Sequence, residues 1–122
     1  MPIYEYDGKP VVFDREGMME RLMDDEDLAR KLTEAFLKDI PQRFDMLREC
    51  LSTENVKNAE RLAHLIKGAS ASVGGDALTA VAFKMEKASR AGDLIAVGEW
   101  VDELEYEFRQ LKEAMEKELK KL

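Results

Sequence analysis

The stretch that decides the fold is residues 62–75, which read LAHLIKGASASVGG. Within it and just before it, apolar residues recur at intervals of three and four positions: Ala59, Leu62, Ile66, Ala69 and Val73. This spacing predicts one apolar stripe along an α-helix. At about 100° per residue, His64 lies about 160–200° around that helix from both Leu62 and Ile66. The only histidine of the chain is therefore predicted to point away from the core.

The helix surface around His64 is predicted to be low and basic. Gly68 lies one turn after the histidine and Ala71 two turns after it, so little side-chain volume covers the ring. A glycine inside a helix costs about 1 kcal/mol relative to alanine, which indicates that access for a large partner is gained here. Three cations share this face, with Glu60 among them: Lys57, Arg61 and Lys67. The alternative interpretation is an exposed histidine on an ordinary polar face.

The same stretch is part of a longer pattern. It runs through two predicted helices and consists of His64-Leu65-Ile66-Lys67-Gly68, Ser70, Gly74, Leu78 and Met85-Glu86. The pattern resembles the signature of histidine-containing phosphotransfer (HPt) domains, which is H-x-L-K-G, a small or hydroxyl residue, a glycine, a leucine and later L-E. The resemblance covers residues 13–116. Ile66, Ala69 and Met85 stand where leucine, serine and leucine are usual, and none of these differences removes a polar group.

The resemblance implies a helical bundle that carries a phosphoryl group and is not itself an enzyme. His64 would accept the group from the phosphoaspartate of a receiver domain and pass it to another receiver. No cofactor or metal is implied in this chain, because the magnesium ion belongs to the partner receiver. The donor is usually a hybrid sensor histidine kinase, so the chain is either a free protein or a module of such a kinase.

Two further side chains are predicted to assist His64. Near neutral pH an imidazole is largely uncharged and nucleophilic, so an outward ring can accept a phosphoryl group. Lys67 lies one turn on and can offset the roughly two negative charges that the group brings. Glu86 is the candidate for orienting the ring, since the two residues lie ten and eleven positions from the glycine turn between their helices. The resemblance implies the same role. The alternative for Glu86 is a surface carboxylate paired with Lys84 or Arg90.

Composition indicates a small globular protein. The 122 residues, 45% hydrophobic and 37% charged, suffice for one core. The net charge of −7 disfavours nucleic acid and anionic membranes as partners, and no apolar run reaches the about 18 residues of a membrane span. The start has no signal-peptide pattern and the single cysteine, Cys50, can form no internal disulfide, so we expect a cytoplasmic location and a buried thiol. One histidine and one cysteine predict no zinc site.

We predict a single all-α domain over residues 1–122. Residues 1–13 form an N-terminal arm, either extended or folded into a hairpin, and residues 14–23 form a short helix that caps one end of the bundle. Residues 26–122 hold four amphipathic helices joined by short loops, which favours an antiparallel up-down bundle.

Polar residues mark the expected helix starts. Ser52 or Thr53 is expected to cap the helix of His64, and Asp76 the helix that follows it. The last helix carries a heptad-like apolar stripe, which leaves open a coiled-coil dimer. One apolar stripe per helix and short loops favour the monomeric bundle.

Two other functions would fit parts of the same pattern. A helical adaptor that docks receiver domains without being phosphorylated would keep the fold, but intact His64, Lys67 and Gly68 argue against it. The dimerisation helices of histidine kinases carry an acidic residue directly after their histidine and a proline a few residues on. Here Leu65 follows the histidine, and no proline lies beyond Pro41. The sequence therefore favours the phosphoryl carrier.

Overall fold

Five helices make up the described part of the chain, residues 9–119 of a computed structural model. They are α1 (Arg15–Arg21), α2 (Glu26–Ser52), α3 (Val56–Ser72), α4 (Asp76–Arg90) and α5 (Leu94–Leu119). The all-helical prediction is confirmed. The predicted N-terminal arm or hairpin falls mostly on residues 1–8, outside the described residues, as do residues 120–122 at the end of the predicted bundle.

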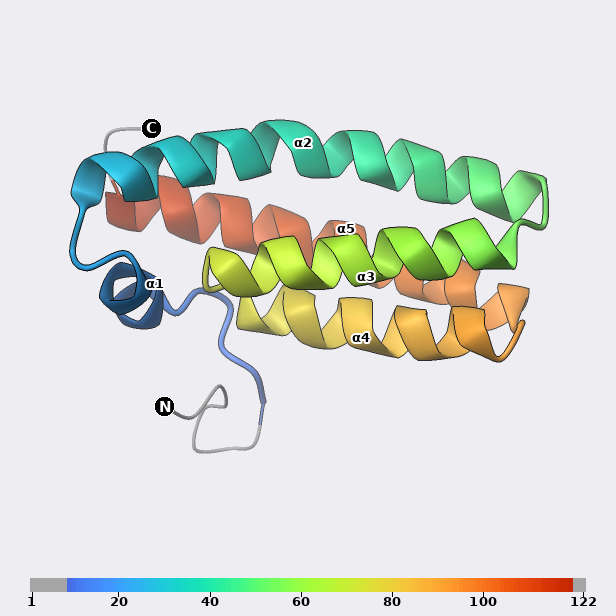
Figure 1. Cartoon of the computed structure of the whole chain (residues 1–122). Coiled ribbons are helices and arrows are strands. Elements are labelled where there is room, and N and C mark those ends of the chain that lie inside the picture. The colour runs from blue at the N-terminus through green and yellow to red at the C-terminus, as the bar shows by residue number, and fades with distance from the viewer. Residues whose placement is uncertain (1–8, 120–122) are drawn as a thin grey trace.

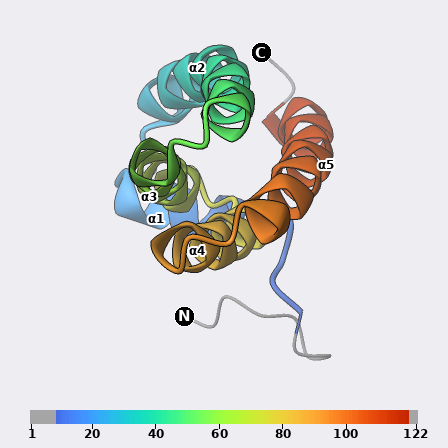
Figure 2. The ribbon, with the colours of Figure 1, turned by 90° about the vertical axis from the view of Figure 1, so that its right-hand side faces the viewer.

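The four long helices lie side by side and alternate in direction (Figure 1). Seen end-on, they surround one core in the order α2, α3, α4 and α5, and α5 also packs against α2 (Figure 2). The contact between α3 and α4 is the most extensive within the described part of the chain. Short loops return each helix beside the preceding one, so the apolar stripes face each other.

The stripes meet in one hydrophobic core. Each of the four long helices contributes large side chains with almost no exposed area, among them Ile40, Leu47, Leu62, Ile66, Leu78, Met85, Leu104 and Leu111. Phe108 of α5 packs against Phe36 and Phe44 of α2, with ring centroids 6.0 and 5.5 Å away. Burial of one side chain of this size stabilises the fold by about 1.5–3 kcal/mol. The predicted burial of Cys50 is confirmed.

The turn between α3 and α4 is closed by α1 and the residue before it. The backbone N–H of Asp14 donates to the carbonyl oxygen of Gly74 over 2.7 Å. Arg21, at the end of α1, donates from its guanidinium to the carbonyl oxygen of Ala71 over 2.9 Å. That carbonyl belongs to the last turn of α3 and also accepts from the backbone N–H of Gly74 over 3.2 Å. The short helix α1 thus covers one end of the bundle (Figure 1).

Two helices begin differently from the prediction. The side chain of Asn55 caps α3, whereas Ser52 and Thr53 end α2 and donate their hydroxyl hydrogens back to its backbone. Both hydroxyls bond to the carbonyl oxygen of Glu49 at the end of α2, so the cap of the next helix falls to a later polar residue. Asp76 is the first residue of α4 and its side chain is buried, while Gly75 occupies the cap position without a side-chain bond.

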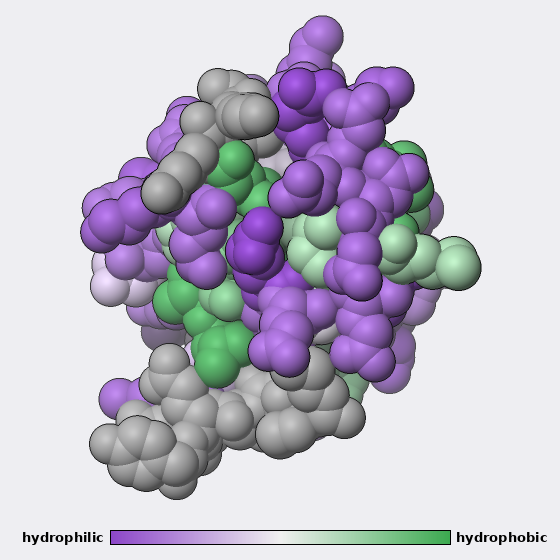
Figure 3. Space-filling model, turned by 90° about the vertical axis from the view of Figure 1, so that its left-hand side faces the viewer, coloured by the Kyte–Doolittle hydropathy of each residue, from purple (hydrophilic) through white to green (hydrophobic). Residues whose placement is uncertain are grey.

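The end of the bundle at α1 shows hydrophobic patches between hydrophilic side chains (Figure 3). A hollow at this end has Phe13 and Met19 among its lining residues, together with six acidic ones: Asp14, Glu16, Glu20, Asp24, Glu26 and Glu118. Across residues 9–119, no helix combines the length and the apolar character that crossing a membrane requires.

Candidate functional site

His64 lies on the outer side of α3, with 64% of its side chain exposed. Leu62 and Ile66, on the opposite side of the helix, are buried in the core. The Nδ1 atom of the ring contacts α4, whereas Nε2 makes no hydrogen bond with the described residues. One ring nitrogen is therefore used within the fold and the other is presented to the outside.

Glu86 of α4 lies beside this ring. It is only 5% exposed, and its Oε2 atom is 2.8 Å from Nδ1 of His64. Its other oxygen, Oε1, accepts a hydrogen bond from Nζ of Lys67 over 2.7 Å. The extensive packing of α3 on α4 holds the helices at the separation that this bridge requires. The structure thus brings together three of the residues singled out in the sequence.

The hydrogen bonds keep the carboxyl group of Glu86 ionised. The bond from Lys67 is the largest effect and lowers the pKa of Glu86 below its ordinary 4.5, burial opposes this, and the bond from His64 lowers the pKa further. An ionised carboxylate can only accept hydrogen bonds, so the hydrogen in the contact with His64 belongs to Nδ1. In the neutral ring the lone pair then lies on Nε2, the outward nitrogen.

Arg90 adds a further cation to the cluster formed by His64, Glu86 and Lys67. Its Nε atom donates to Oε2 of Glu60 over 2.9 Å, and its Nη2 atom lies 3.7 Å from Oε2 of Glu86. The bond to Glu60 raises the pKa of Arg90, so the guanidinium stays charged. From the sequence, Arg90 is expected only as an alternative partner for Glu86. Their spacing of four residues along one helix is the signal that indicates the contact.

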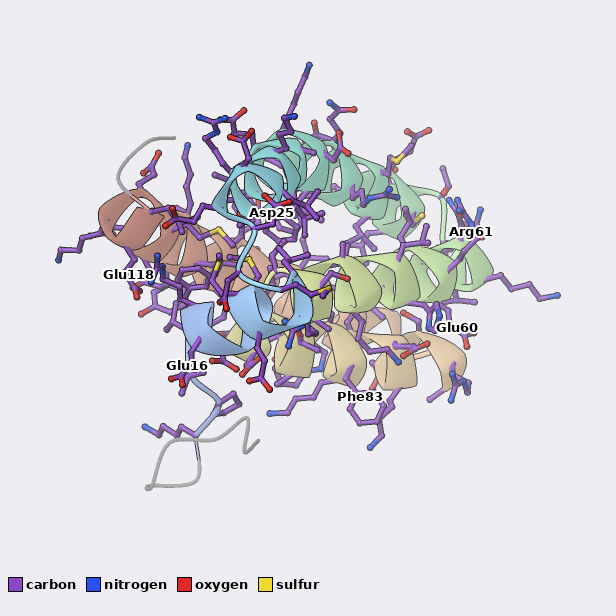
Figure 4. The ribbon with its side chains drawn as sticks, turned by 60° about the vertical axis from the view of Figure 1, so that its left-hand side comes forward. Glu16, Asp25, Glu60, Arg61, Phe83 and Glu118 are labelled. Atoms are coloured by element: carbon purple, nitrogen blue, oxygen red, sulfur yellow. The ribbon has the colours of Figure 1, made fainter. Side chains whose placement is uncertain are left out.

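The residues predicted to form a docking face lie along α3. A Cβ atom added at Gly68 would meet no neighbouring atom within 4 Å, and Ala71 is exposed. Lys57 and Arg61 are exposed near the start of the helix, where Figure 4 shows Arg61. The guanidinium of Arg61 bonds to a side chain of its own helix, over 3.1 and 2.8 Å, and is not drawn into the cluster around the ring.

Charge is distributed unevenly over the molecule. Residues 56–90, which hold α3 and α4, contain six Lys or Arg and three Asp or Glu, a net charge of +3. The whole chain carries −7, so the remaining residues carry −10. The basic side chains of the hairpin are Lys57, Arg61, Lys67, Lys84, Lys87 and Arg90. This distribution favours the approach of an anionic group to the face that holds the ring.

The cluster around His64 is a surface site and not a cavity. A hollow of about 920 Å³ lies at the α1 end, and none of its lining residues belongs to the cluster. Among residues 9–119, no group of three or more His, Cys, Asp or Glu side chains is placed to hold a metal ion.

Comparison with known proteins identifies one family. A family model described as Hpt domain matches residues 31–116. The match covers more than two thirds of the chain and includes α3, α4 and the whole cluster around His64. It confirms the resemblance drawn from the sequence. No curated protein and no solved structure matches the chain.

Proposed function

Because the chain belongs to the Hpt domain family, we propose that His64 is its phosphorylation site and carries a phosphoryl group between receiver domains. Hpt domains are histidine phosphotransfer modules of two-component phosphorelays, act as phosphocarriers rather than enzymes, and interact with receiver domains. One observation carries the proposal. The 2.8 Å contact between Nδ1 of His64 and the buried carboxylate of Glu86 turns Nε2, with its lone pair, to the outside.

The proposed transfer requires no proton to leave the ring. The lone pair on Nε2 of His64 attacks the phosphorus atom of a receiver phosphoaspartate, and an N–P bond forms. The bond between phosphorus and the aspartate oxygen breaks, and its electron pair leaves with the aspartate carboxylate. The ring gains one positive charge, and its Nδ1 hydrogen stays bonded to Glu86. The reverse sequence of the same steps delivers the group to a second receiver.

Glu86 is proposed to orient the ring and to stabilise it after phosphorylation. A carboxylate that accepts from Nδ1 holds the tautomer in which Nε2 is the nucleophile. Once the ring is positively charged, the same hydrogen bond joins two opposite charges and becomes stronger. Burial of Glu86 keeps competing water away from this bond.

Lys67 is proposed to offset the charge of the incoming group. Its ammonium group has three hydrogens, and the bond to Oε1 of Glu86 uses one of them. The other two remain able to bond to phosphoryl oxygens. A lysine suits this task because it is a compact charge on a flexible side chain.

The receiver is proposed to supply the aspartate and the magnesium ion, and to dock on the low surface of α3. Gly68 and Ala71 leave room beside the ring, and Lys57 and Arg61 extend a basic surface from it. A hybrid sensor histidine kinase is the proposed donor, and we expect the chain to act as a monomer in the cytoplasm.

The test is transfer from phosphorylated receiver domains of the source organism in the presence of magnesium. We expect one phosphate per chain, labile in acid and stable in alkali, as a phosphorus–nitrogen bond requires. His64→Gln should abolish the label while leaving the helical circular dichroism spectrum unchanged. Profiling all receivers in this way would also identify donor and acceptor.

Label on serine or aspartate, or label retained in His64→Gln, would contradict the proposal. A chain that binds receivers but is labelled by none of them would instead be the adaptor considered above. Binding of unphosphorylated receivers, measured by calorimetry, separates these two outcomes.

A further inference from the structure

One aromatic ring beside the cluster around His64 is not buried in the hydrophobic core. Phe83 lies on the outer side of α4 (Figure 4) and is 47% exposed. Two ammonium groups lie near this ring, with Nζ of Lys67 5.2 Å and Nζ of Lys87 4.9 Å from its centroid. Cations within about 6 Å of an aromatic centroid are attracted by the electron-rich face of the ring.

The ring is linked to His64 through Lys67. Nζ of Lys67 lies 5.2 Å from the centroid of Phe83 and donates to Oε1 of Glu86, and the other oxygen of Glu86 contacts Nδ1 of the histidine. A free lysine side chain has about 2 kcal/mol of rotamer entropy, so one hydrogen bond alone holds its ammonium group loosely. Here the ring and the carboxylate hold the same ammonium group at one place.

We propose that Phe83 is a positioning residue whose ring holds the ammonium group of Lys67 beside His64, ready for the phosphoryl group. The inference rests on the proposed function of His64. In this scheme Phe83 contacts neither the imidazole ring of His64 nor the phosphoryl group, and it acts through Lys67. Lys87 forms no ion pair with any carboxylate of the described residues, so its charge adds to the positive potential around the same ring.

Such a residue shifts the position of the transfer equilibrium, whether or not it also changes the rate. A lysine held beside phosphohistidine makes the phosphorylated chain more stable relative to the phosphorylated receiver. A residue that only docks the receiver changes how fast the equilibrium between separated proteins is reached, but it cannot change its position. The ratio of label on the chain to label on the receiver therefore distinguishes positioning from docking.

The experiment uses the full chain and the receiver that labels it fastest, mixed at concentrations low enough for the two proteins to remain mostly separate. Phe83→Leu, which keeps an apolar side chain without a π face, should lower the equilibrium ratio about two- to fivefold, the equivalent of about 0.5–1 kcal/mol. Phe83→Trp should restore the ratio. In a Lys67→Gln background, Phe83→Leu should have no further effect, because the residue through which it acts is gone.

The chain offers a matched control in a second lysine and ring. Nζ of Lys84 lies 5.3 Å from the centroid of Trp100, a pair that has no contact with Glu86. Trp100→Leu removes the same kind of interaction and should leave the equilibrium ratio unchanged.

Three results would overturn the inference. The first is an unchanged ratio in Phe83→Leu that is merely reached more slowly, and the second is a loss of the same size in the Lys67→Gln background. Both leave the proposed function intact, because the wild-type chain is labelled. The third is a wild-type chain that no receiver labels, which overturns the proposed function and this inference together.

Discussion

Gly68 and Glu86 on the open face of the α3–α4 hairpin can be compared with Gly74 and Asp76 at its turn. Both places combine a glycine with a buried carboxylate. A Cβ atom added at Gly68 would meet open space, whereas one added at Gly74 would lie 2.5 Å from the carbonyl oxygen of Asp14. Glycine leaves the surface low in the first place and allows close backbone contact in the second.

The pKa values of the two buried carboxyl groups, Glu86 and Asp76, are shifted in opposite directions. Hydrogen bonds, above all from Lys67, lower the pKa of Glu86. Burial, with a contribution from Asp14 and against the effect of Arg21, raises the pKa of Asp76 to about 6. Its Oδ2 atom is buried without a hydrogen-bond partner among the described residues. Burial alone therefore raises the pKa of a carboxyl group, whereas cations within hydrogen-bonding distance keep it ionised despite burial.

The largest expected effect is at the turn between α3 and α4, in the variant Gly74→Ala. The residue has φ +77°, and its new Cβ atom would collide with backbone, so the free energy of unfolding should fall by about 2–5 kcal/mol. Denaturant unfolding measures it. Gly92→Ala is the control, because it has φ +76° and no neighbour within 4 Å, and it should lose only about 1–2 kcal/mol. Equal losses of stability in the two variants would show that the backbone of Asp14 makes no close contact with residue 74.

The next largest effect is expected for Glu86→Gln, on the face of the hairpin that holds Gly68 and His64. It replaces the hydrogen bond between His64 and a charged group, worth about 1.5–3 kcal/mol, by a neutral one worth about 0.5–1.5 kcal/mol, so the initial rate of labelling should fall roughly 5- to 10-fold. Glu60→Gln alters only an exposed ion pair with Arg90 and should change the rate less than about fivefold. Similar labelling rates in both variants would mean that Glu86 does not orient His64.

A smaller effect is expected for Asp76→Asn, in stability and with a definite pH dependence. The folded protein binds the proton of Asp76 more tightly than the unfolded chain, so wild-type stability falls as the pH rises from 3.8 to about 6. The variant avoids this loss and should be about 1–2 kcal/mol more stable at pH 7–8, less than the full pKa shift implies because solvent at the end of α4 screens part of the effect.

Thermal unfolding as a function of pH checks this prediction. The difference between Asp76→Asn and wild type should vanish near pH 3.5. The sign is opposite for Glu86, whose stabilising contribution is present above its ordinary pKa of 4.5 and is lost as the pH falls through its lowered value. A difference between Asp76→Asn and wild type that does not vary with pH would contradict the contrast between the two carboxylates.

The smallest effect is expected for Gly68. Gly68→Ala should raise the free energy of unfolding by about 0.5–1 kcal/mol, because alanine favours the helix and nothing fills the space beside it. Labelling by a receiver should be nearly unchanged. Gly68→Gln should keep part of the gain in stability but slow labelling severalfold, since the longer side chain covers the docking face. Unimpaired labelling of Gly68→Gln would mean that the low surface has no role in docking.

Helical periodicity carried much of the prediction. The stripe from Ala59 to Val73 indicated which side of α3 faces the core, and the structure has His64 on the opposite side. Nearly equal distances from the glycine turn, ten and eleven positions, indicated that Glu86 could reach the histidine. The helix caps were less predictable, because Ser52 and Thr53 can serve the end of one helix or the start of the next, and the loop conformation decides between these uses.

The contact of Lys67 with Phe83 was not predicted at all. Lys67 stands out in the sequence only through its distance from His64 on α3, and nothing in the sequence marks Phe83 on α4 as its neighbour. The contact depends on how far each helix is rotated about its axis and how close the two axes lie. Packing of the entire core sets both quantities, so no local pattern contains them.

By itself, the sequence determined an all-helical chain of the Hpt family and the direction of each side chain about its own helix. The reason is that 3.6 residues per turn fix this direction wherever the helix lies. Only the tertiary structure decided that Glu86 also bonds to Lys67, and that Oδ2 of Asp76 has no hydrogen-bond partner among the described residues. Those pairings depend on distances of a few ångströms between helices, to which hydrogen bonds and buried charges are far more sensitive than hydrophobic burial is.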